Sequence, residues 1–207
     1  MKRIVILILL SIMPIFILVC TKDKPPQPGT PENPRYYYPL QKDYSWRYIQ
    51  LIKPGCTEIK DSFDLTILGA NSRHSDVGYD RLWKGSDDTI FIYEKKDTLF
   101  EENVEHGVPI FKILVGPVRA GTFWKDAYYD YLIQGIEDVT LTINGETYKR
   151  CAKVVKTPRD PTPSKPDKIY EWWAPEKGEV KEVELDTLGI CQRSIELRYF
   201  SPSGVFP

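Results

Sequence analysis

The chain has 207 residues, of which 28 are basic and 29 are acidic, and its formal net charge is −1. Charges of both signs are mixed along the chain, which argues against the clustered basic surface that favours nucleic acid as a partner. Aromatic residues make up 13% of the chain, a proportion that suits pleated sheets and ligand-contacting surfaces.

The N-terminus combines a positive start with a short apolar run. Lys2 and Arg3 precede residues 4–19, in which only one serine and one proline interrupt the apolar character. A membrane-spanning helix needs about 20 apolar residues, and this run is shorter. A positive start followed by a brief apolar core is typical of a secretory signal peptide, which we predict for residues 1–19.

The apolar run ends at Cys20, where the chain becomes polar. Ile17, Leu18 and Val19 before this cysteine resemble the lipobox of bacterial lipoproteins, although that family prefers a small side chain at the position of Val19. In that family a peptidase cuts before a cysteine that already carries diacylglycerol. The resemblance implies a lipid anchor on Cys20, with acyl chains such as palmitate holding the protein at the membrane.

Two other interpretations of the N-terminus stay open, namely an uncleaved anchor with an incidental cysteine and plain secretion. Thr21 stands where an aspartate would, by resemblance to lipoproteins, imply retention at the inner membrane. We therefore expect an exported protein that is anchored to the cell envelope. In a cell with two membranes, the outer membrane is the favoured location.

The segment after Cys20 is rich in proline. Residues 22–35 contain five prolines, one glycine and no large apolar side chain, so they cannot bury enough surface to fold. An extended polyproline chain rises about 3.1 Å per residue, which gives this spacer a reach of roughly 40 Å. We predict a lipidated, proline-rich linker over residues 20–35 and a single β-rich domain over residues 36–207.

The domain shows the period of two that is typical of strands, and after the signal peptide no helical period extends over a dozen residues. In chain order, strands are predicted at residues 44–52, 62–68, 89–93, 109–115, 128–134, 139–143, 148–155, 169–174, 179–185 and 190–200. Between the seventh and eighth, residues 158–166 hold four prolines, so no sheet can continue through them.

The clearest hairpin spans residues 138–155, with the sequence DVTLTINGETYKRCAKVV. Val139, Leu141 and Ile143 alternate with polar residues. Asn144 and Gly145 follow them and suit the two positive-φ positions of a type I′ turn.

About ten short strands without crossover helices predict an all-β fold built on an antiparallel, curved sheet. A sheet of that size curls, closes or splits into two layers. The sequence leaves open a half-barrel, a barrel and a sandwich. Each of these would offer a concave or inter-sheet apolar surface.

Three cysteines follow Cys20, namely Cys56, Cys151 and Cys191. Export to an oxidising compartment would permit one disulfide and leave one thiol, and any of the three pairings is possible. Cys151 and Cys191 lie in predicted strands, and Cys56 follows a Pro-Gly turn. Three buried free thiols are the alternative. The spacing does not suit a zinc site, and we predict no metal or cofactor.

The residues that could carry catalysis are few. His74 and His106 are the only histidines, and both lie in polar segments without a nucleophile-elbow sequence nearby. The acid pairs at residues 87–88 and 101–102 could serve glycoside hydrolysis only if their carboxyl groups faced each other across a sugar site. Adjacent acids are more often solvated, so we assign no catalytic residue and predict a non-enzymatic protein.

Three stretches resemble a group of uncharacterised bacterial lipoproteins and exported β-rich domains, whose marks are YYPL followed by Trp, GxxW and WYAPxxGxVK. They are YYYPLQKDYSWRY (residues 36–48), GPVRAGTFWKD (residues 116–126) and EWWAPEKGEVK (residues 171–181). Lys42-Asp43 replaces a usual glycine, and Glu179 replaces an apolar residue. The resemblance implies an exported β-rich fold akin to the half-barrels of lipoprotein carriers, without an established activity.

These observations together predict a membrane-anchored lipoprotein that binds an apolar ligand, a lipid or a peptide in the cell envelope. A structural or assembly subunit that docks on another envelope protein is the alternative. A hydrolase is the third interpretation, and it has no catalytic residue to support it.

Overall fold

The structure, a computed structural model, describes residues 32–52, 55–73, 76–84, 89–103, 110–161 and 165–206. The predicted signal peptide, Cys20 and most of the predicted linker lie outside these residues. Within the described ranges, no helix is long and apolar enough to cross a membrane.

The described residues form one short helix and twelve strands. They are α1 (Pro34–Tyr37), β1 (Ser45–Ile52), β2 (Glu58–Arg73), β3 (Asp76–Lys84), β4 (Thr89–Glu94), β5 (Thr98–Asn103), β6 (Phe111–Val115), β7 (Phe123–Lys125), β8 (Tyr129–Thr140), β9 (Thr147–Pro158), β10 (Lys168–Ala174), β11 (Gly178–Leu185) and β12 (Cys191–Ser201).

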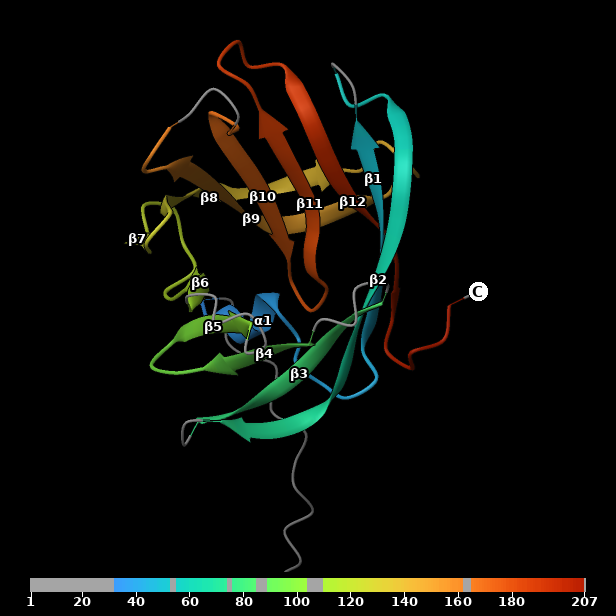
Figure 1. Ribbon diagram of the computed structural model, residues 1–207, viewed down its shortest axis with the longest axis vertical. Helices are drawn as coiled ribbons and strands as arrows, with labels where there is room; N and C mark the ends of the chain where they lie inside the picture. The colour runs from blue at the N-terminus through green and yellow to red at the C-terminus, as the bar shows by residue number, and fades with distance from the viewer. Residues whose placement is uncertain are drawn as a thin grey trace, which may run out of the picture.

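The strands form a single sheet in the order β6-β5-β4-β3-β2-β1-β12-β11-β10-β9-β8-β7, and all neighbours are antiparallel. The sheet curls into a nearly closed barrel, in which β3–β6 lie below β8–β12 and α1 lies between the two halves (Figure 1). The prediction of an all-β fold with a curved antiparallel sheet is therefore confirmed. The single continuous sheet excludes the sandwich.

The edges of the sheet, β6 and β7, approach each other where the barrel nearly closes. No ladder joins them in the described sheet, but the indole Nε1 of Trp124 in β7 donates a hydrogen bond of 3.0 Å to the carbonyl oxygen of Lys112 in β6. The rings of Phe111 and Tyr128 stack across the same seam, with centroids 5.7 Å apart. Side chains, rather than backbone pairing, therefore hold the two edges together.

Three strands, β3, β5 and β7, are absent from the sequence prediction. Gly78 weakens the strand pattern of β3, but the structure needs glycine there, since an added Cβ would lie 2.3 Å from the carbonyl oxygen of Ile92. The segments predicted separately at residues 128–134 and 139–143 belong largely to one strand, β8. Irregularities at Gln134 and Asp138 let this strand continue where the alternation breaks.

The predicted type I′ turn at Asn144 and Gly145 is wrong. Only Gly145 has a positive φ, of 69°, whereas a type I′ turn needs positive φ at both central residues. The strand β8 ends at Thr140, before the turn, and the backbone amides of Thr142 and Ile143 bind the carboxylate of Glu196 instead of a partner strand. This contact holds the hairpin tip in a wider loop.

A two-residue turn of the expected kind joins β4 to β5. Lys96 and Asp97 have φ values of 49° and 55°, and Lys95 and Thr98 exchange both backbone hydrogen bonds. Neither Lys96 nor Asp97 is glycine or asparagine, which explains why the sequence pattern did not reveal this turn.

The N-terminal segment fills part of the barrel interior. Pro34 occupies the first turn of α1, and the side chain of Asn33 accepts a hydrogen bond from the amide of Arg35 at 2.7 Å. The buried rings of Tyr37 and Tyr38 belong to the central hydrophobic core. The folded body therefore begins before the boundary predicted at residue 36.

Two of the three stretches on which the resemblance rests pack against each other. The ring of Tyr38 stacks on Trp46, with centroids 5.8 Å apart, and lies 5.6 Å from the ring of Trp173. The hydroxyl of Tyr48 donates a hydrogen bond of 2.9 Å to the backbone oxygen of Glu179. The start of the domain is thereby fastened to the β10–β11 hairpin.

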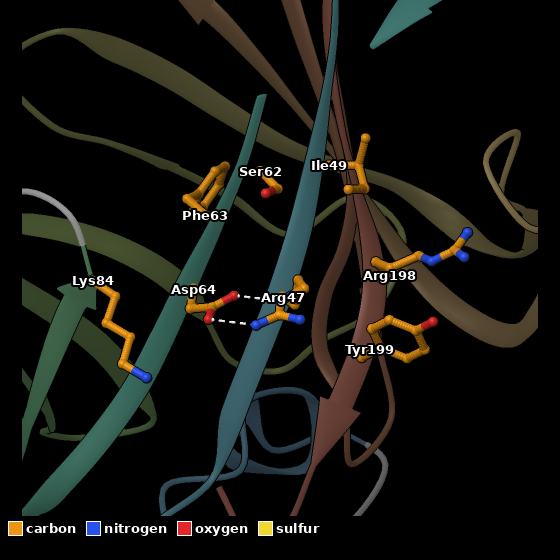
Figure 2. A pocket seen from close by; sticks show the side chains of 8 residues that line it. All are labelled: Arg47, Ile49, Ser62, Phe63, Asp64, Lys84, Arg198 and Tyr199. Atoms are coloured by element: carbon orange, nitrogen blue, oxygen red, sulfur yellow. Dashed lines mark hydrogen bonds and ion pairs between the residues drawn. The ribbon is translucent and has the colours of Figure 1, made fainter. Parts of the chain in front are cut away.

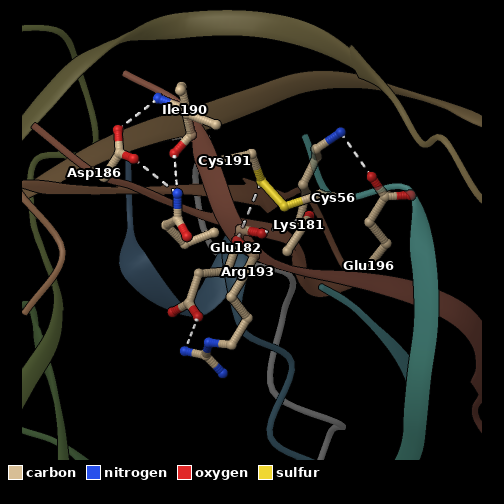
Figure 3. The surroundings of a disulfide bond; sticks show 10 residues. Cys56, Lys181, Glu182, Asp186, Ile190, Cys191, Arg193 and Glu196 are labelled. Carbon is tan, nitrogen blue, oxygen red and sulfur yellow. Dashed lines mark hydrogen bonds and ion pairs between the residues drawn. A yellow bond between two sulfur atoms is a disulfide. The ribbon is translucent and has the colours of Figure 1, made fainter. Parts of the chain in front are cut away.

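Glu196 holds the β8–β9 hairpin against the outer face of β11 and β12. Its side chain is almost fully buried, with 1% exposed. One carboxylate oxygen accepts the amides of Thr142 and Ile143 at 2.6 and 3.0 Å, and the other forms an ion pair of 2.7 Å with Lys181 (Figure 3). A buried carboxylate is stable when it is paired and hydrogen-bonded in this way.

A disulfide joins Cys56 in the turn after β1 to Cys191 at the start of β12 (Figure 3). Cys151 in β9 is buried and unpaired. Burial raises the pKa of its thiol to about 12, so this thiol stays protonated and unreactive at neutral pH. The structure thus selects one of the three pairings that the sequence left open.

We expect the double replacement Cys56→Ser and Cys191→Ser to lower the free energy of unfolding by about 2–5 kcal/mol, because the disulfide closes a loop across 135 positions. The corresponding fall in Tm is roughly 5–20 °C. Calorimetry with and without reductant measures it. Reductant should lower the Tm of the wild-type protein and leave that of the double variant unchanged, and a wild-type Tm insensitive to reductant would contradict the pairing.

Candidate functional site

The inner face of the barrel encloses a cavity of about 400 Å³. Side chains from ten strands, β2–β6 and β8–β12, line it. Its volume lies within the range of about 300–1,000 Å³ that is usual for small-molecule sites. The cavity is the place where the curled sheet leaves its interior unfilled, beyond the aromatic side chains that follow α1.

One side of the cavity is apolar and aromatic. It is formed by residues of β2, β3, β4 and β6, namely Phe63, Leu65, Trp83, Ile90, Phe111 and Ile113. The rings of Phe63 and Trp83 contact each other, with centroids 5.0 Å apart. This wall can take up the apolar part of a ligand.

The opposite side of the cavity carries carboxylates from β10 and β11. Carboxylate oxygens of Glu171, Glu179 and Glu182 lie within 4.8 Å of one another. On a regular strand, residues three apart point to opposite faces. Glu179 and Glu182 share a face because the register shifts between Trp172 and Trp173 of β10, which leaves Val180 as an extra residue in β11.

Lys156 of β9 supplies a positive charge to this cluster. Its Nζ forms an ion pair with Glu171 and lies 4.0 Å from an oxygen of Glu182. Burial by itself lowers the pKa of this lysine, but attraction by Glu171 and Glu182 outweighs burial and sets its pKa well above the ordinary value. Three carboxylates could hold a divalent cation, yet the ammonium of Lys156 competes for the same oxygens.

Two arginines add further ion pairs to the lining. Arg81 donates to Glu101 at 2.8 Å and to the hydroxyl of Tyr38 at 2.7 Å. Arg193 donates to Glu182 at 2.8 Å and forms a second ion pair with Glu184. Each of the two guanidinium groups is therefore already bonded to at least one carboxylate.

Glu179 differs from the other carboxylates of the cavity. Its Oε1 is buried and accepts no hydrogen bond within the described part of the chain. Burial, and then repulsion by Glu171 and Glu182, hold the pKa of the Glu179 carboxyl well above its ordinary value. A buried polar atom without a hydrogen-bond partner lowers folding stability by roughly 1–3 kcal/mol. The Glu179 carboxyl is therefore a destabilising group in the cavity lining.

A second hollow, of about 470 Å³, lies beside β1, β2 and β12. Arg47 binds Asp64 there through two hydrogen bonds of 2.8 and 3.0 Å. Figure 2 shows Lys84 on one side of this pair and Arg198 on the other, with the guanidinium group of Arg198 pointing away from the pair. The three cations therefore do not converge on one point, as an anion site would require.

The structure places few of the predicted candidates in the cavity. His74, His106 and the acids at residues 87–88 lie outside the described residues, as does Cys20. Glu101 lines the cavity with its partner Arg81, and the neighbouring Glu102 does not line it. The disulfide borders another hollow on the outer side of β12, apart from this cavity.

The adjacent tryptophans of the third resembling stretch point to opposite faces, as predicted. Trp173 is buried and lines the cavity, where its Nε1 donates to Glu171 at 3.1 Å. Trp172 lies on the outer side, and its Nε1 donates to Glu137 at 2.8 Å. Sequence reasoning missed Glu171, Glu182 and Lys156. For Glu179 the sequence offered one signal: it stands where the resembling group of lipoproteins carries an apolar residue.

Comparison with known proteins supports the fold of the chain. No protein-family model matches it, and no curated protein does. A protein described as exported, with a YmcC-like fold, from Bacteroides fragilis has a TM-score of 0.57 at 12% identity. The match covers 80% of this chain and 99% of the other.

A protein described as a lipoprotein, from Parabacteroides distasonis, has a TM-score of 0.53 at 16% identity, over 80% of this chain and 98% of the other. At these identities the likeness shows a shared fold. It agrees with the curled, all-β barrel described above.

We expect the substitution Glu179→Gln to stabilise the protein increasingly as the pH rises from about 4.5. The folded state raises the pKa of this carboxyl above its usual value of 4.5, so the folded protein keeps a proton that the unfolded chain releases. This carboxyl therefore lowers the free energy of unfolding of the wild type between pH 4.5 and its folded-state pKa. The glutamine variant does not titrate there, so it lacks this loss of stability.

Thermal unfolding at pH 4.5, 6 and 7.5 measures the effect, at roughly 2–4 °C for each kcal/mol. The control is Glu137→Gln, which changes a carboxylate whose side chain is 45% exposed on the outer face. A Tm difference between Glu179→Gln and wild type that stays constant or shrinks as the pH rises would contradict the prediction.

Proposed function

We propose that the protein is a lipid-anchored protein of the bacterial cell envelope that binds a partly apolar ligand in the cavity of its β-barrel. The single observation that carries this proposal is the cavity itself, with an aromatic wall on one side and buried charged groups on the other. Concave pockets that combine apolar side chains with convergent polar groups are typical of binding sites.

The charged wall refines the expected ligand. A purely apolar molecule would remove water from Glu179 and Lys156 without offering them a hydrogen bond, which is costly. A ligand with an apolar body and a polar end would satisfy both walls. From the sequence we expect an apolar ligand, a lipid or a peptide. The charged wall favours, among these, a ligand that is amphipathic.

The envelope location rests on the N-terminal sequence, with Cys20 as the anchor. The likeness to proteins described as exported and as a lipoprotein supports this proposal, although it reaches only the fold. We propose a non-catalytic role. Among the described residues that line the cavity there is no serine, cysteine or histidine that could act as a nucleophile.

A role as an assembly subunit is the second candidate, and the outer face of β7 and β8 favours it. Phe123 and Leu132, which are partners across the two strands, are 58% and 41% exposed there. Large apolar side chains that lie exposed close together mark interaction sites on many proteins. An envelope partner that covers them is compatible with ligand binding on the inner face.

The substitution Ile195→Trp should abolish retention of a ligand, because Ile195 lines the cavity and the larger ring would fill it. The matched control is Ile136→Trp, since Ile136 is 40% exposed and does not belong to the cavity lining. Each protein is isolated from membranes without denaturation, extracted with organic solvent and analysed by mass spectrometry.

We expect wild type and Ile136→Trp to release the same amphipathic molecule in near-stoichiometric amount, and Ile195→Trp to release less than about a tenth of it. A wild-type protein that carries no molecule and binds none of a panel of amphipathic compounds would rule out the ligand-binding function.

The substitution Cys20→Ser should abolish incorporation of an alkyne-labelled fatty acid into the protein, because serine lacks the thiol that accepts the diacylglycerol. The control is Cys151→Ser, which removes a buried thiol far along the chain and should leave the label in place. Gel fluorescence after labelling in cells reads the result. Equal labelling of wild type and Cys20→Ser would show that the anchor lies elsewhere.

A further inference from the structure

Charge balance around Glu179 distinguishes this cavity from a neutral lipid pocket. Four carboxylates, those of Glu171, Glu179, Glu182 and Glu184, share the ammonium of Lys156 and the guanidinium of Arg193. If all six groups are ionised, the group has an excess of two negative charges. Buried charges are stable only when they are paired, so this excess is relieved either by a proton on Glu179, whose pKa is raised, or by further positive charge.

The cations close to Glu179 are committed to other carboxylates. Lys156 bonds Glu171, Arg193 bonds Glu182, and Arg81 bonds Glu101 through one nitrogen, while the buried Nε of Arg81 has no hydrogen-bond partner within the described residues. Within the described residues, Glu179 forms no ion pair, and its buried Oε1 accepts no hydrogen bond. The missing partner is therefore a hydrogen-bond donor, and the local charge favours a donor that is positive.

The bulge at Val180 brings about this arrangement. On a regular strand Glu179 and Glu182, which are three positions apart, would point to opposite faces of β11. The bulge directs both carboxylates into the cavity, and bulges often re-aim side chains beside functional sites. The backbone oxygen of Glu179 is also fixed, because it accepts the hydroxyl of Tyr48 at 2.9 Å.

We infer that the cavity binds a small amphipathic amine, whose ammonium group donates hydrogen bonds to Glu179 and whose apolar body lies against the aromatic wall. This inference rests on the proposed ligand-binding function and names the ligand class for the same cavity. The volume of about 400 Å³ sets the size of the molecule, because it suits a compact ligand rather than a whole diacyl lipid.

The aromatic side chains of the lining suit an ammonium ligand for a second reason. Phe63 and Trp83 form one contacting pair, and Trp173 stands beside the carboxylates and donates to Glu171. Cations are attracted to the faces of such rings, and the attraction is stronger when water is excluded. An ammonium group near Glu179 would thus meet a carboxylate and the ring of Trp173, the register partner of Glu179 in β10.

Three probes of nearly equal size test the inference, namely 4-phenylbutylamine, 4-phenylbutanol and 4-phenylbutyrate. They share one apolar body and differ in a positive, a neutral and a negative end. Their binding to the protein purified from membranes in a non-ionic detergent is measured at pH 7.5 by isothermal titration calorimetry. The same titrations are carried out with Glu179→Gln and with the outer-face control Glu137→Gln.

We expect the amine to bind wild type and Glu137→Gln at least tenfold more tightly than the alcohol and the carboxylate. In Glu179→Gln the amine should lose about tenfold in affinity, while the affinity for the alcohol stays within about twofold. Near-UV circular dichroism checks that each variant is folded. If Glu179→Gln fails to fold, the order in which the wild type binds the three probes still tests whether the cavity prefers an amine.

Equal binding of the three probes, or a preference for the carboxylate, would overturn the amine inference and leave ligand binding in the cavity intact. An amine preference that survives in Glu179→Gln would also overturn it, because another group would then select the charge. Failure of all three probes to bind, together with the absence of any co-purified molecule, would remove the proposed function itself.

Discussion

Filling of the inner face is the constraint on which the rest of this structure depends. A twelve-stranded sheet that curls into a barrel encloses more space than its own inward side chains can fill. Tyr37, Tyr38 and Trp46 fill one part of the interior, and the stacking of Tyr38 on Trp46 and Trp173 joins the N-terminal segment to β1 and β10. The part that these rings do not reach remains as the cavity.

The same arrangement sets the electrostatics of the cavity. Charged groups that would be solvated on an open sheet face one another across a confined space, where each must find a partner. Lys156, Arg81 and Arg193 achieve this through ion pairs with carboxylates of neighbouring strands. Glu179 does not, and an unsatisfied buried carboxylate is a feature that folding stability alone would not favour. Such a local conflict is expected where a protein binds something.

The interior carboxylates contrast with Glu196 on the other face of the same sheet. Glu196 is more deeply buried than Glu179, yet one of its oxygens accepts the amides of Thr142 and Ile143 and the other pairs with Lys181. It acts as a structural clasp that holds the β8–β9 hairpin. Burial of a carboxylate therefore has two distinct outcomes in this protein, and the presence or absence of hydrogen-bond donors separates them.

The sequence by itself determined the fold class, because alternation of apolar and polar residues with turn signals is a local property of the chain. It also determined the opposite orientations of Trp172 and Trp173 and the positions of most strands. Only the tertiary structure decided that Cys56 pairs with Cys191, since pairing depends on which distant segments meet. It likewise decided the carboxylate cluster. An extra residue at Val180 breaks the period of two, and no local pattern shows that Glu179 and a lysine of β9 will face the same cavity.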